Sequence, residues 1–368
     1  MRIDRLELDF FRNYGRQAVD FDGRCNVIFG ENAQGKTNLL EALVYLSCGK
    51  SPRARTDREM IRFDAPAASL CAQVFARERD FKVKAELFRE RRRKLSVNQV
   101  PAKNSGALSE VYNTVFFCPE DLFLIREGAA ARRKFMDTAL CQLRPRYAAA
   151  LAEYKRLYEH KTRILRDWEE KPSLLDTLDE FSLRMAQTGA ILIHYRAHFL
   201  KKLRELAPPI HRDFSGGREE LELVYQTVSS VTDPLAAPRD ILPQLLAHQE
   251  SHRRAELDSR QCLSGPHKDD FEVLLNGVSA KTYASQGQTR TAALSLKLGE
   301  RELFYQDAGE WPVLLLDDVL SELDPKRQEF VLNRIQGGQV FITCCEDDKL
   351  ESLAAGKAFR IHNGQLVG

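Results

Sequence analysis

The pattern of hydrophobic and polar residues divides the chain into three regions, and the first is dominated by strand signals. Apolar residues alternate with charged ones over 6–10, and strand-like alternation returns over 70–75 and 81–88. This is the period of two expected of half-buried strands. The short apolar run at 27–29 is instead typical of a fully buried strand. A helical spacing of leucines over 39–46 follows it.

The middle region, from about residue 128 to 206, carries almost no strand signal. Apolar residues recur there at heptad-like spacing, which predicts a long helix with one apolar face. We expect this helix to end at the Pro-Pro pair at 208–209, because proline lacks an amide hydrogen and clashes with the preceding turn. We interpret its Met and aromatic residues as helix-packing core and not as a cofactor site. The apolar face consists of Leu178, Phe181, Met185, Leu192, Tyr195, Phe199 and Leu206.

The last hundred residues return to an α/β pattern. Alternation over 271–275 is followed by Asn276-Gly277, a dipeptide typical of hairpin turns. A helix is predicted over 288–304, and buried strands over 313–316 and 339–343.

Both ends of the chain are therefore α/β and the middle is helical. We predict one α/β domain with an inserted, mostly helical lobe. Its N-terminal part is expected to span 1–120, the lobe 121–260 and the C-terminal part 261–368.

Composition narrows the class of protein. The 368 residues are 43% hydrophobic and 29% charged, as in globular proteins. Lys+Arg 55 against Asp+Glu 53 excludes a uniformly basic DNA-coating protein, but not one with a basic face. The eight cysteines lack a C-x-x-C pair, and neither a signal peptide nor an apolar run of about 18 residues is present. We expect a cytoplasmic protein without a membrane partner.

Residues 30–37 fit the phosphate-binding pattern G-x-x-x-x-G-K-[ST], between a predicted strand and a predicted helix. The glycines let backbone N–H groups close around phosphate oxygens, and the helix directs its positive end at them. Lys36 would reach the β- and γ-phosphates and Thr37 would ligate Mg²⁺, so ATP and Mg²⁺ are the predicted cofactors. The predicted nucleotide-binding residues are Gly30, Glu31, Asn32, Ala33, Gln34, Gly35, Lys36, Thr37 and Asn38.

The apolar run at 313–316 ends in Asp317 and Asp318. A carboxylate at the end of a buried strand beside a P-loop is placed to hold Mg²⁺, directly or through water, which we expect of Asp317. Asp318 would then orient the attacking water. The catalytic residues predicted are therefore Lys36, Asp317 and Asp318; either acid alone would be a weak signal.

Residues 285–288, Ser-Gln-Gly-Gln, precede the predicted helix at 288–304. A hydroxyl and backbone N–H groups at a helix N-terminus can form a second anion site. The alternative is a plain helix cap with Ser285 as the capping residue. The position of the segment shortly before Asp317 favours the anion site.

These motifs stand in the order found in ABC-type ATPases, with residues 321–324 at the place of the D-loop. The helical stretch between them resembles the SMC-like branch, and the whole chain resembles the RecF family of bacterial recombination mediators. The matching segments are 11–14, 30–37, 53–63, 119–122, 132–137, 265–270, 285–290 and 315–324.

The resemblance implies an ABC-type, SMC-like P-loop ATPase head with an inserted helical lobe. ATP would join two copies head to tail, with Ser285, Gly287 and Gln288 acting in trans, and the dimer would close on double-stranded or gapped DNA. The implied role is recombinational repair, replication-gap processing, recombinase loading and the SOS response, with RecR/RecO-like mediators as partners.

Two departures from other ABC ATPases concern hydrolysis. Residues 343–346 read Thr-Cys-Cys-Glu and so lack a switch His, and Asp318 stands where transporters usually have Glu. A shorter base predicts a weak, DNA-stimulated ATPase that works as a switch and not as a motor.

Basic residues gather at 53–62, 89–94 and 132–134. None of these runs is interleaved with aromatic residues, so base stacking on single strands is not indicated. We expect at least one run to contact duplex phosphates without sequence readout. The candidate DNA contacts are Arg53, Arg55, Arg91, Arg92 and Arg93.

Three other functions were weighed. An SMC-like chromosome-organising head needs long arms, and the roughly 143 residues between Cys118 and Cys262 hold a helical hairpin but no hinged coiled coil. A transporter ATPase subunit would have a switch His and a membrane partner. A nuclease is disfavoured because the sequence shows no second acidic metal-binding cluster.

Overall fold

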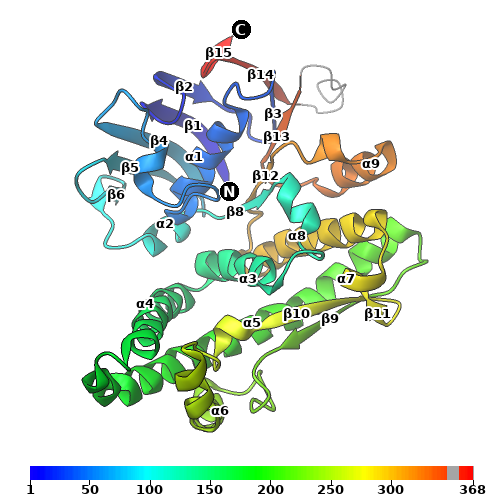
Figure 1. Ribbon diagram of the computed structural model, residues 1–368. Helices are drawn as coiled ribbons and strands as arrows, with labels where there is room; N and C mark the ends of the chain where they lie inside the picture. Colours follow the sequence, from blue (N-terminus) through cyan, green and yellow to red (C-terminus); the bar gives the residue numbers. More distant parts are fainter. Residues whose placement is uncertain (346–355, 368) are drawn as a thin grey trace. The chain divides into compact units, whose positions relative to one another are not determined.

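The computed structural model describes residues 1–345 and 356–367, which form two compact units (Figure 1). The head unit comprises Met1–Leu122 and Leu296–Gly368, and the insert unit comprises Phe123–Ser295. The first boundary lies near the predicted residue 120. The second lies well beyond the predicted residue 260, because β10 (Asp270–Leu275) pairs with β9 (Leu221–Gln226) inside the insert unit.

One sheet of the head unit is antiparallel, in the order β2-β1-β4-β5-β6-β7. The predicted alternation is confirmed at Leu6 and Leu8 of β1, which are buried while their neighbours are partly exposed. It is wrong at Phe10, which lies beyond the end of β1 and is exposed. The turn between β6 and β7 places Asn98 and Gln99 at positive φ. The strands are β1 (Arg2–Asp9), β2 (Arg16–Asp20), β4 (Ala67–Ala76), β5 (Arg79–Phe88), β6 (Lys94–Val97) and β7 (Val100–Pro101).

The other sheet of the head unit has the order β15-β14-β3-β13-β12-β8 and is parallel except for the edge strand β15. The predicted buried strands at 27–29, 313–316 and 339–343 are confirmed as its centre. The hairpin of β14 and β15 was not predicted, because its residues are mostly exposed and short of apolar pattern. The strands are β3 (Cys25–Phe29), β8 (Thr114–Phe117), β12 (Val313–Leu316), β13 (Val340–Cys344), β14 (Lys357–His362) and β15 (Gln365–Val367).

Helix α1 (Lys36–Cys48) contacts strands of both sheets of the head unit. Leu39, Leu40, Leu43 and Leu46 are buried on several of its sides, which is the pattern of a helix enclosed by core. This packing fixes the start of α1, and hence the loop before it. The smaller elements of the head unit are η1 (Asp57–Met60), α2 (Gly106–Ser109), η2 (Pro119–Phe123), η5 (Leu320–Glu322) and α9 (Pro325–Arg334).

Helix α5 (Leu178–Ser215) is the centre of the insert unit and packs against both α4 and α6 (Figure 1). Its predicted apolar face is confirmed, since Leu178, Met185, Leu192 and Phe199 are buried. A three-stranded antiparallel sheet, β11-β10-β9, completes the unit. The other elements are α3 (Ala129–Leu143), α4 (Pro145–Asp167), η3 (Pro172–Thr177), α6 (Pro238–Ser259), η4 (Pro266–Lys268), β11 (Val278–Ser279) and α7 (Ala280–Tyr283).

The prediction that α5 ends at its Pro-Pro pair is wrong. The helix continues through Pro208 and Pro209 to Ser215 and is capped by Gly216, which has φ 62°. Ile210 and His211 beyond the prolines are buried, and this burial offsets the lost amide hydrogen bonds, whose cost alone would stop an isolated helix.

Helix α8 (Gln286–Ala308) begins in the insert unit and ends in the head unit. The sequence predicted this helix, two residues shorter at its start and four at its end. Across residues 1–345 and 356–367, none of the helices combines the length and the apolar content needed to cross a membrane.

Candidate nucleotide-binding site

The loop between β3 and α1 depends on two glycines with backbone angles that side chains rarely adopt. Gly30 has φ 149° and Gly35 has φ 117°. A Cβ on Gly30 would lie 2.4 Å from the carbonyl oxygen of Ile361, and one on Gly35 would lie 2.7 Å from Asn13 Nδ2. Both glycines of the predicted motif are therefore required by the fold of the loop itself.

Lys36 is held at this loop by main-chain acceptors. Its Nζ donates to the carbonyl oxygens of Gly30 at 2.7 Å and of Glu31 at 3.1 Å. The Lys36 residue is only 4% exposed. Its buried charge is stabilised by these two backbone carbonyl groups. The ammonium is thus placed where the loop would enclose a phosphate.

Two segments distant in sequence brace the loop from outside. Asn13 Nδ2 and the N–H of Gly364 both donate to the carbonyl oxygen of Gln34, at 2.8 and 3.0 Å. Tyr14 Oη donates to the carbonyl oxygen of Gly35 at 2.8 Å. This brace was not predicted, because no local pattern marks residues 13 and 14 or the turn at 363–364.

The remaining predicted loop residues take ordinary positions around this frame. Ala33 adopts φ 65°, Asn32 Oδ1 accepts from Cys345 Sγ at 3.4 Å, and Asn38 Nδ2 donates to Asn13 Oδ1 at 2.9 Å. The loop is therefore fixed along most of its length.

Thr37 and Asp317 meet across the parallel sheet. Thr37 follows β3 and Asp317 follows β12, and the two strands flank β13. Because the carboxyl ends of parallel neighbours meet at one edge, Thr37 Oγ1 reaches Asp317 Oδ1 at 2.9 Å. Two predicted metal ligands that are 280 positions apart in sequence are thus brought together.

The surroundings of Asp317 suit a cation. Burial raises the pKa of its carboxyl, while hydrogen bonds from Thr37 and Thr343 oppose that rise. A hydroxyl and a carboxylate oxygen are hard ligands of the kind that Mg²⁺ prefers. The donor set of Thr37 and Asp317 therefore fits this ion.

Asp318 lies beside this pair in a strained conformation. Its φ is 52°, in the left-handed region, and its N–H donates to Thr343 Oγ1 at 2.8 Å. The same Thr343 hydroxyl lies 3.0 Å from Asp317 Oδ1 and 3.3 Å from Asp318 Oδ1. The buried threonine at the end of β13 thus contacts both acids, a role that sequence analysis did not assign; Glu346, nearby in sequence, lies outside the described residues.

Residues 285–288, the signature segment, form a reciprocal helix cap in the insert unit. The N–H of Gln288 donates to Ser285 Oγ at 3.2 Å, and the N–H of Ser285 donates to Gln288 Oε1 at 2.8 Å. This is a capping box, so the cap interpretation describes the local structure correctly. It leaves the exposed Ser285 hydroxyl free to serve as a donor as well.

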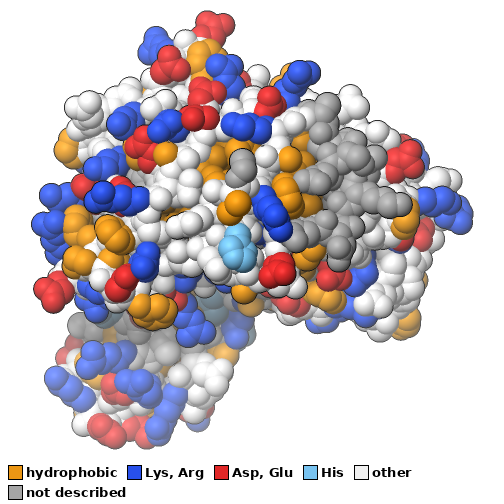
Figure 2. Space-filling view, turned by 90° about the horizontal axis from the view of Figure 1, so that it is seen from above, with side chains coloured by type: hydrophobic (Ala, Val, Ile, Leu, Met, Phe, Trp, Pro, Cys, Tyr) orange, Lys and Arg blue, Asp and Glu red, His pale blue; other side chains and the backbone are white. Residues whose placement is uncertain are grey.

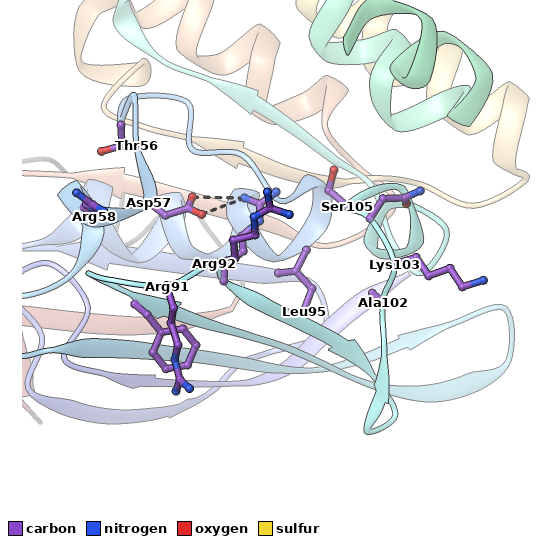
Figure 3. Close-up of a pocket in the computed structure, with 12 residues that line it drawn as sticks. Thr56, Asp57, Arg58, Arg91, Arg92, Leu95, Ala102, Lys103 and Ser105 are labelled. Carbon is purple, nitrogen blue, oxygen red and sulfur yellow. Dashed lines mark hydrogen bonds and ion pairs between the residues drawn. The ribbon is translucent and has the colours of Figure 1, made fainter. Parts of the chain in front are cut away.

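The basic residues of the head unit fall into two groups. Arg53 lies by the P-loop helix, where its Nη1 donates to Asn38 Oδ1 at 3.3 Å. Arg91, Arg92 and Arg93 instead line a separate cavity of about 530 Å³ (Figure 3). Arg55 is exposed next to η1 and its backbone N–H is bound by Glu59. Thr56, Asp57 and Arg58, which follow Arg55 in sequence, line the same cavity as the three arginines.

Within the cavity the three neighbouring arginines differ. Arg93 is half-buried, and its guanidinium donates to Tyr45 Oη at 2.8 Å and to the carbonyl oxygen of Gly49 at 2.6 Å, beside Asp57. Arg91 lies over the Phe88 ring at 3.7 Å, and Arg92 is exposed. Arg93 holds the wall of the cavity, whereas Arg91 and Arg92 present their charge to solvent.

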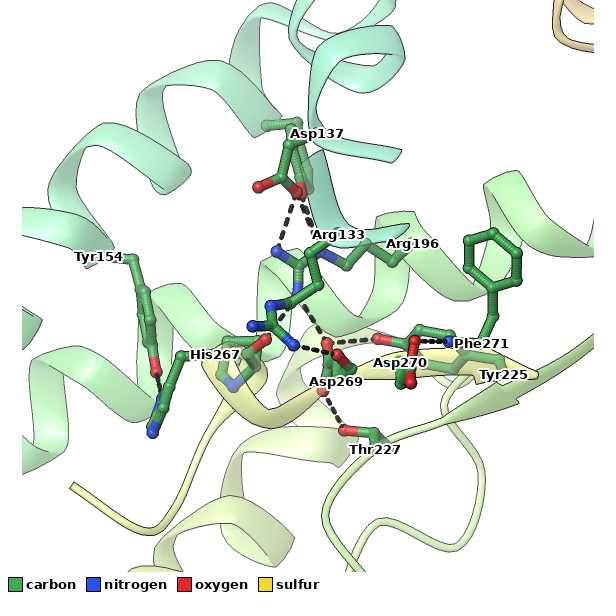
Figure 4. Close-up of polar contacts among 12 residues, drawn as sticks. Arg133, Asp137, Tyr154, Arg196, Tyr225, Thr227, His267, Asp269, Asp270 and Phe271 are labelled. Atoms are coloured by element: carbon green, nitrogen blue, oxygen red, sulfur yellow. Dashed lines mark hydrogen bonds and ion pairs between the residues drawn. The ribbon is translucent and has the colours of Figure 1, made fainter. Parts of the chain in front are cut away.

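Of the third basic run, in the insert unit, Arg132 is buried, Arg133 is partly buried and Lys134 is exposed. Arg132 is 5% exposed and makes a two-pronged pair with Asp270, at 2.6 and 2.8 Å. Nearby, Arg196 bridges Asp137 and Asp269, and Arg133 donates to the carbonyl oxygen of Asp269 (Figure 4). Arg132 therefore stabilises the fold, whereas Lys134 keeps its side chain exposed.

Seen from above, the head unit carries Lys and Arg side chains interspersed with Asp and Glu (Figure 2). The face in that view is mixed in charge, in keeping with the near-neutral net charge of the chain. Any contact with a polyanion must then depend on local clusters such as the arginine-lined cavity.

Comparison with known proteins places these features in a common context. The family model "RecF/RecN/SMC N terminal domain" matches residues 2–365. A protein of Acetivibrio thermocellus named "DNA replication and repair protein RecF" is 38% identical, over 96% of this chain and 95% of its own length. Its namesake from Clostridium kluyveri is 36% identical, over 100% of this chain and 99% of its own length.

Solved structures agree with the sequence matches. One described as the "recombination mediator protein RecF-ATPrS in RecFOR pathway" superposes with a TM-score of 0.91 at 33% identity, covering 99% of this chain and 97% of that one. A Pyrococcus furiosus Smc head domain superposes with a TM-score of 0.55 at 15% identity, covering 100% of this chain and 96% of that one, which shows a shared fold.

Proposed function

The chain belongs to the RecF family of DNA replication and repair proteins, and on that premise we propose that it is an ATP-gated DNA clamp of recombinational repair. Its fold is the ABC-type, SMC-like ATPase head with an inserted lobe that the sequence predicted. The repair assignment is favoured over the chromosome-organising alternative, because relatives named RecF match at 34–38% identity over the full length and Smc heads at 13–15%.

ATP would bind at the P-loop. Lys36 and the N–H groups of residues 30–37 would receive the phosphates, and Thr37 and Asp317 would hold Mg²⁺, which when bound neutralises charge on the β- and γ-phosphates. The contact between Thr37 and Asp317, at 2.9 Å within a complete G-x-x-x-x-G-K-T loop, is the observation that carries this proposal. A related structure named RecF-ATP supports the choice of nucleotide.

The signature segment would complete the site of a second copy. Ser285, Gly287 and Gln288 stand at the N-terminus of a 23-residue helix, whose positive end favours an anion. ATP would therefore join two chains in a head-to-tail dimer. Asp318 would position water for slow hydrolysis, and loss of the γ-phosphate would release the dimer.

Arginine side chains would hold DNA through its phosphate backbone alone, without contacts to the bases. Arg91 and Arg92 are exposed at the cavity of the head unit. Arg53 contacts Asn38 of the P-loop helix, and Arg55 is exposed next to η1. Duplex or gapped DNA and RecR/RecO-like mediators are the partners that this function calls for, and the RecFOR pathway named for a related structure supports the mediators.

Sedimentation velocity with and without ATP·Mg²⁺ and duplex DNA tests the proposal. We expect a dimer only with ATP and tighter DNA binding in that state, and we expect Lys36→Ala to remain monomeric. Lys155→Ala, which removes an exposed lysine on α4, is the matched control. A native chain that has the same sedimenting mass with and without ATP would contradict the clamp. Equal melting temperatures of the native chain and both variants would show that the substitutions do not act by unfolding the protein.

A further inference from the structure

The side chain of Gln288 is held from two directions in the insert unit. Its Oε1 accepts the N–H of Ser285 at 2.8 Å, and its Nε2 donates to Glu219 Oε1 at 3.0 Å. Glu219 lies in the short connection between α5 and β9, 69 positions before Gln288 in the chain. A carboxylate only accepts hydrogen bonds. Glu219 therefore decides which way the Gln288 amide points.

Glu219 is itself fixed by a buried histidine. Its second oxygen, Oε2, accepts from His211 Nε2 at 3.0 Å, and His211 Nδ1 lies 3.3 Å from Ser295 Oγ. His211 is fully buried on α5, while the Glu219 side chain is 19% exposed. The N–H of Glu219 donates to Ser215 Oγ at 3.3 Å. The carboxylate is thus clamped on its inner side and reaches the signature segment with its outer oxygen.

We propose that Glu219 is a positioning residue for the signature segment, acting through Gln288 on Ser285. When Gln288 is fixed, its backbone N–H donates to one lone pair of Ser285 Oγ. The proton of the exposed Ser285 hydroxyl is then directed outward. This orients the donor that, in the proposed function, meets the nucleotide bound by a second copy. The inference rests on that function, but it concerns a residue that lies outside every motif of the sequence.

The main alternative is that Glu219 only stabilises the end of α5. That role predicts a lower melting temperature but no specific dependence on Gln288. If Glu219 acts by positioning Gln288, the effects of substituting the two residues on dimer affinity should not be additive. Dimer affinity should then depend more on which hydrogen bonds are made than on which of the two residues carries the negative charge.

The first variants remove the contact from either side. Glu219→Ala leaves Gln288 without its acceptor, and we expect the ATP-dependent dimer to weaken about tenfold, as for one charge-assisted hydrogen bond. Gln288→Glu places two carboxylates at hydrogen-bond distance and should weaken it at least as much. In Glu219→Ala, binding of a fluorescent ATP analogue to the single chain should not change, since the P-loop belongs to the head unit.

The decisive variant exchanges the two residues. In Glu219→Gln with Gln288→Glu, the new carboxylate at 288 accepts from Ser285 and from the amide at 219, and that amide still accepts from His211. The net charge beside the helix terminus is the same as in the native chain. We expect the dimer affinity to return to within about threefold of the native value, because every hydrogen bond is restored. No recovery from Gln288→Glu would overturn the proposal.

Mixing complementary variants separates the inference from the function on which it rests. A dimer of Lys36→Ala with Glu219→Ala retains one composite site with a native P-loop and a native signature segment. We expect the mixture to dimerise in ATP when neither variant does so alone at the same concentration. Native dimerisation with an unaffected Glu219→Ala variant overturns the role of Glu219 alone. A native chain that stays monomeric in ATP overturns the proposed function and this inference together.

Discussion

Arg91 and Arg92 in the head unit and Arg132 in the insert unit come from similar basic runs, yet their surroundings are opposite. The first two are exposed at a cavity, whereas Arg132 is buried against Asp270. In the head unit, Thr37 and Asp317 meet at one edge of the parallel sheet. In the insert unit, Arg132 and Arg196 are instead bound within internal networks. A charged run is therefore informative about binding only when its partners in the fold are known.

The largest effect expected is on the P-loop of the head unit. Gly35→Ala adds a Cβ 2.7 Å from Asn13 Nδ2 at a residue with φ 117°, so the loop must change shape and ATP binding should be lost. Gly128→Ala in the insert unit is the control, because its Cβ meets nothing within 4 Å. Isothermal titration with ATP·Mg²⁺ measures both, and native affinity in Gly35→Ala would contradict the strained geometry.

The next effect is on the stability of the insert unit. Arg132→Ala leaves Asp270 and three carbonyl oxygens without their donor, and breaking such a buried pair costs about 3 kcal/mol. Chemical denaturation should show this loss. If Arg132 instead contacted DNA, the variant would keep its stability and lose DNA affinity.

The smallest effect expected is on DNA binding by the head unit. Replacing Arg91 and Arg92 together by Ala should leave the melting temperature unchanged and reduce the slope of log affinity against log salt by about 2, if each arginine neutralises one phosphate. Fluorescence anisotropy with a labelled duplex in ATP and several salt concentrations measures it. Arg93→Ala is the contrast, because its contacts with Tyr45 and Gly49 predict a loss of stability instead.

The features that sequence predicted well are those whose chemistry is local. The P-loop and the buried strand before Asp317 each depend on neighbouring residues, so their spacing is enough to identify them. The alternation in β1 and the apolar face of α5 succeed for the same reason. At Ser285 the sequence favoured an anion site, whereas the local structure is a helix cap.

What sequence could not predict depends on contacts between distant segments. Gln34 is braced by Asn13 and by Gly364, and Gln288 by Glu219, and no local pattern records such pairs. The continuation of α5 past Pro208 has the same origin, because buried residues further along the helix override the local preference of proline.

The position of Thr343 between Asp317 and Asp318 has a consequence that follows from counting protons. The Thr343 hydroxyl accepts from the N–H of Asp318 and has a single proton to donate. The residue that would hold the cation and the residue that would orient water therefore share one hydrogen-bond donor, so the hydrogen bonding of one carboxylate depends on that of the other.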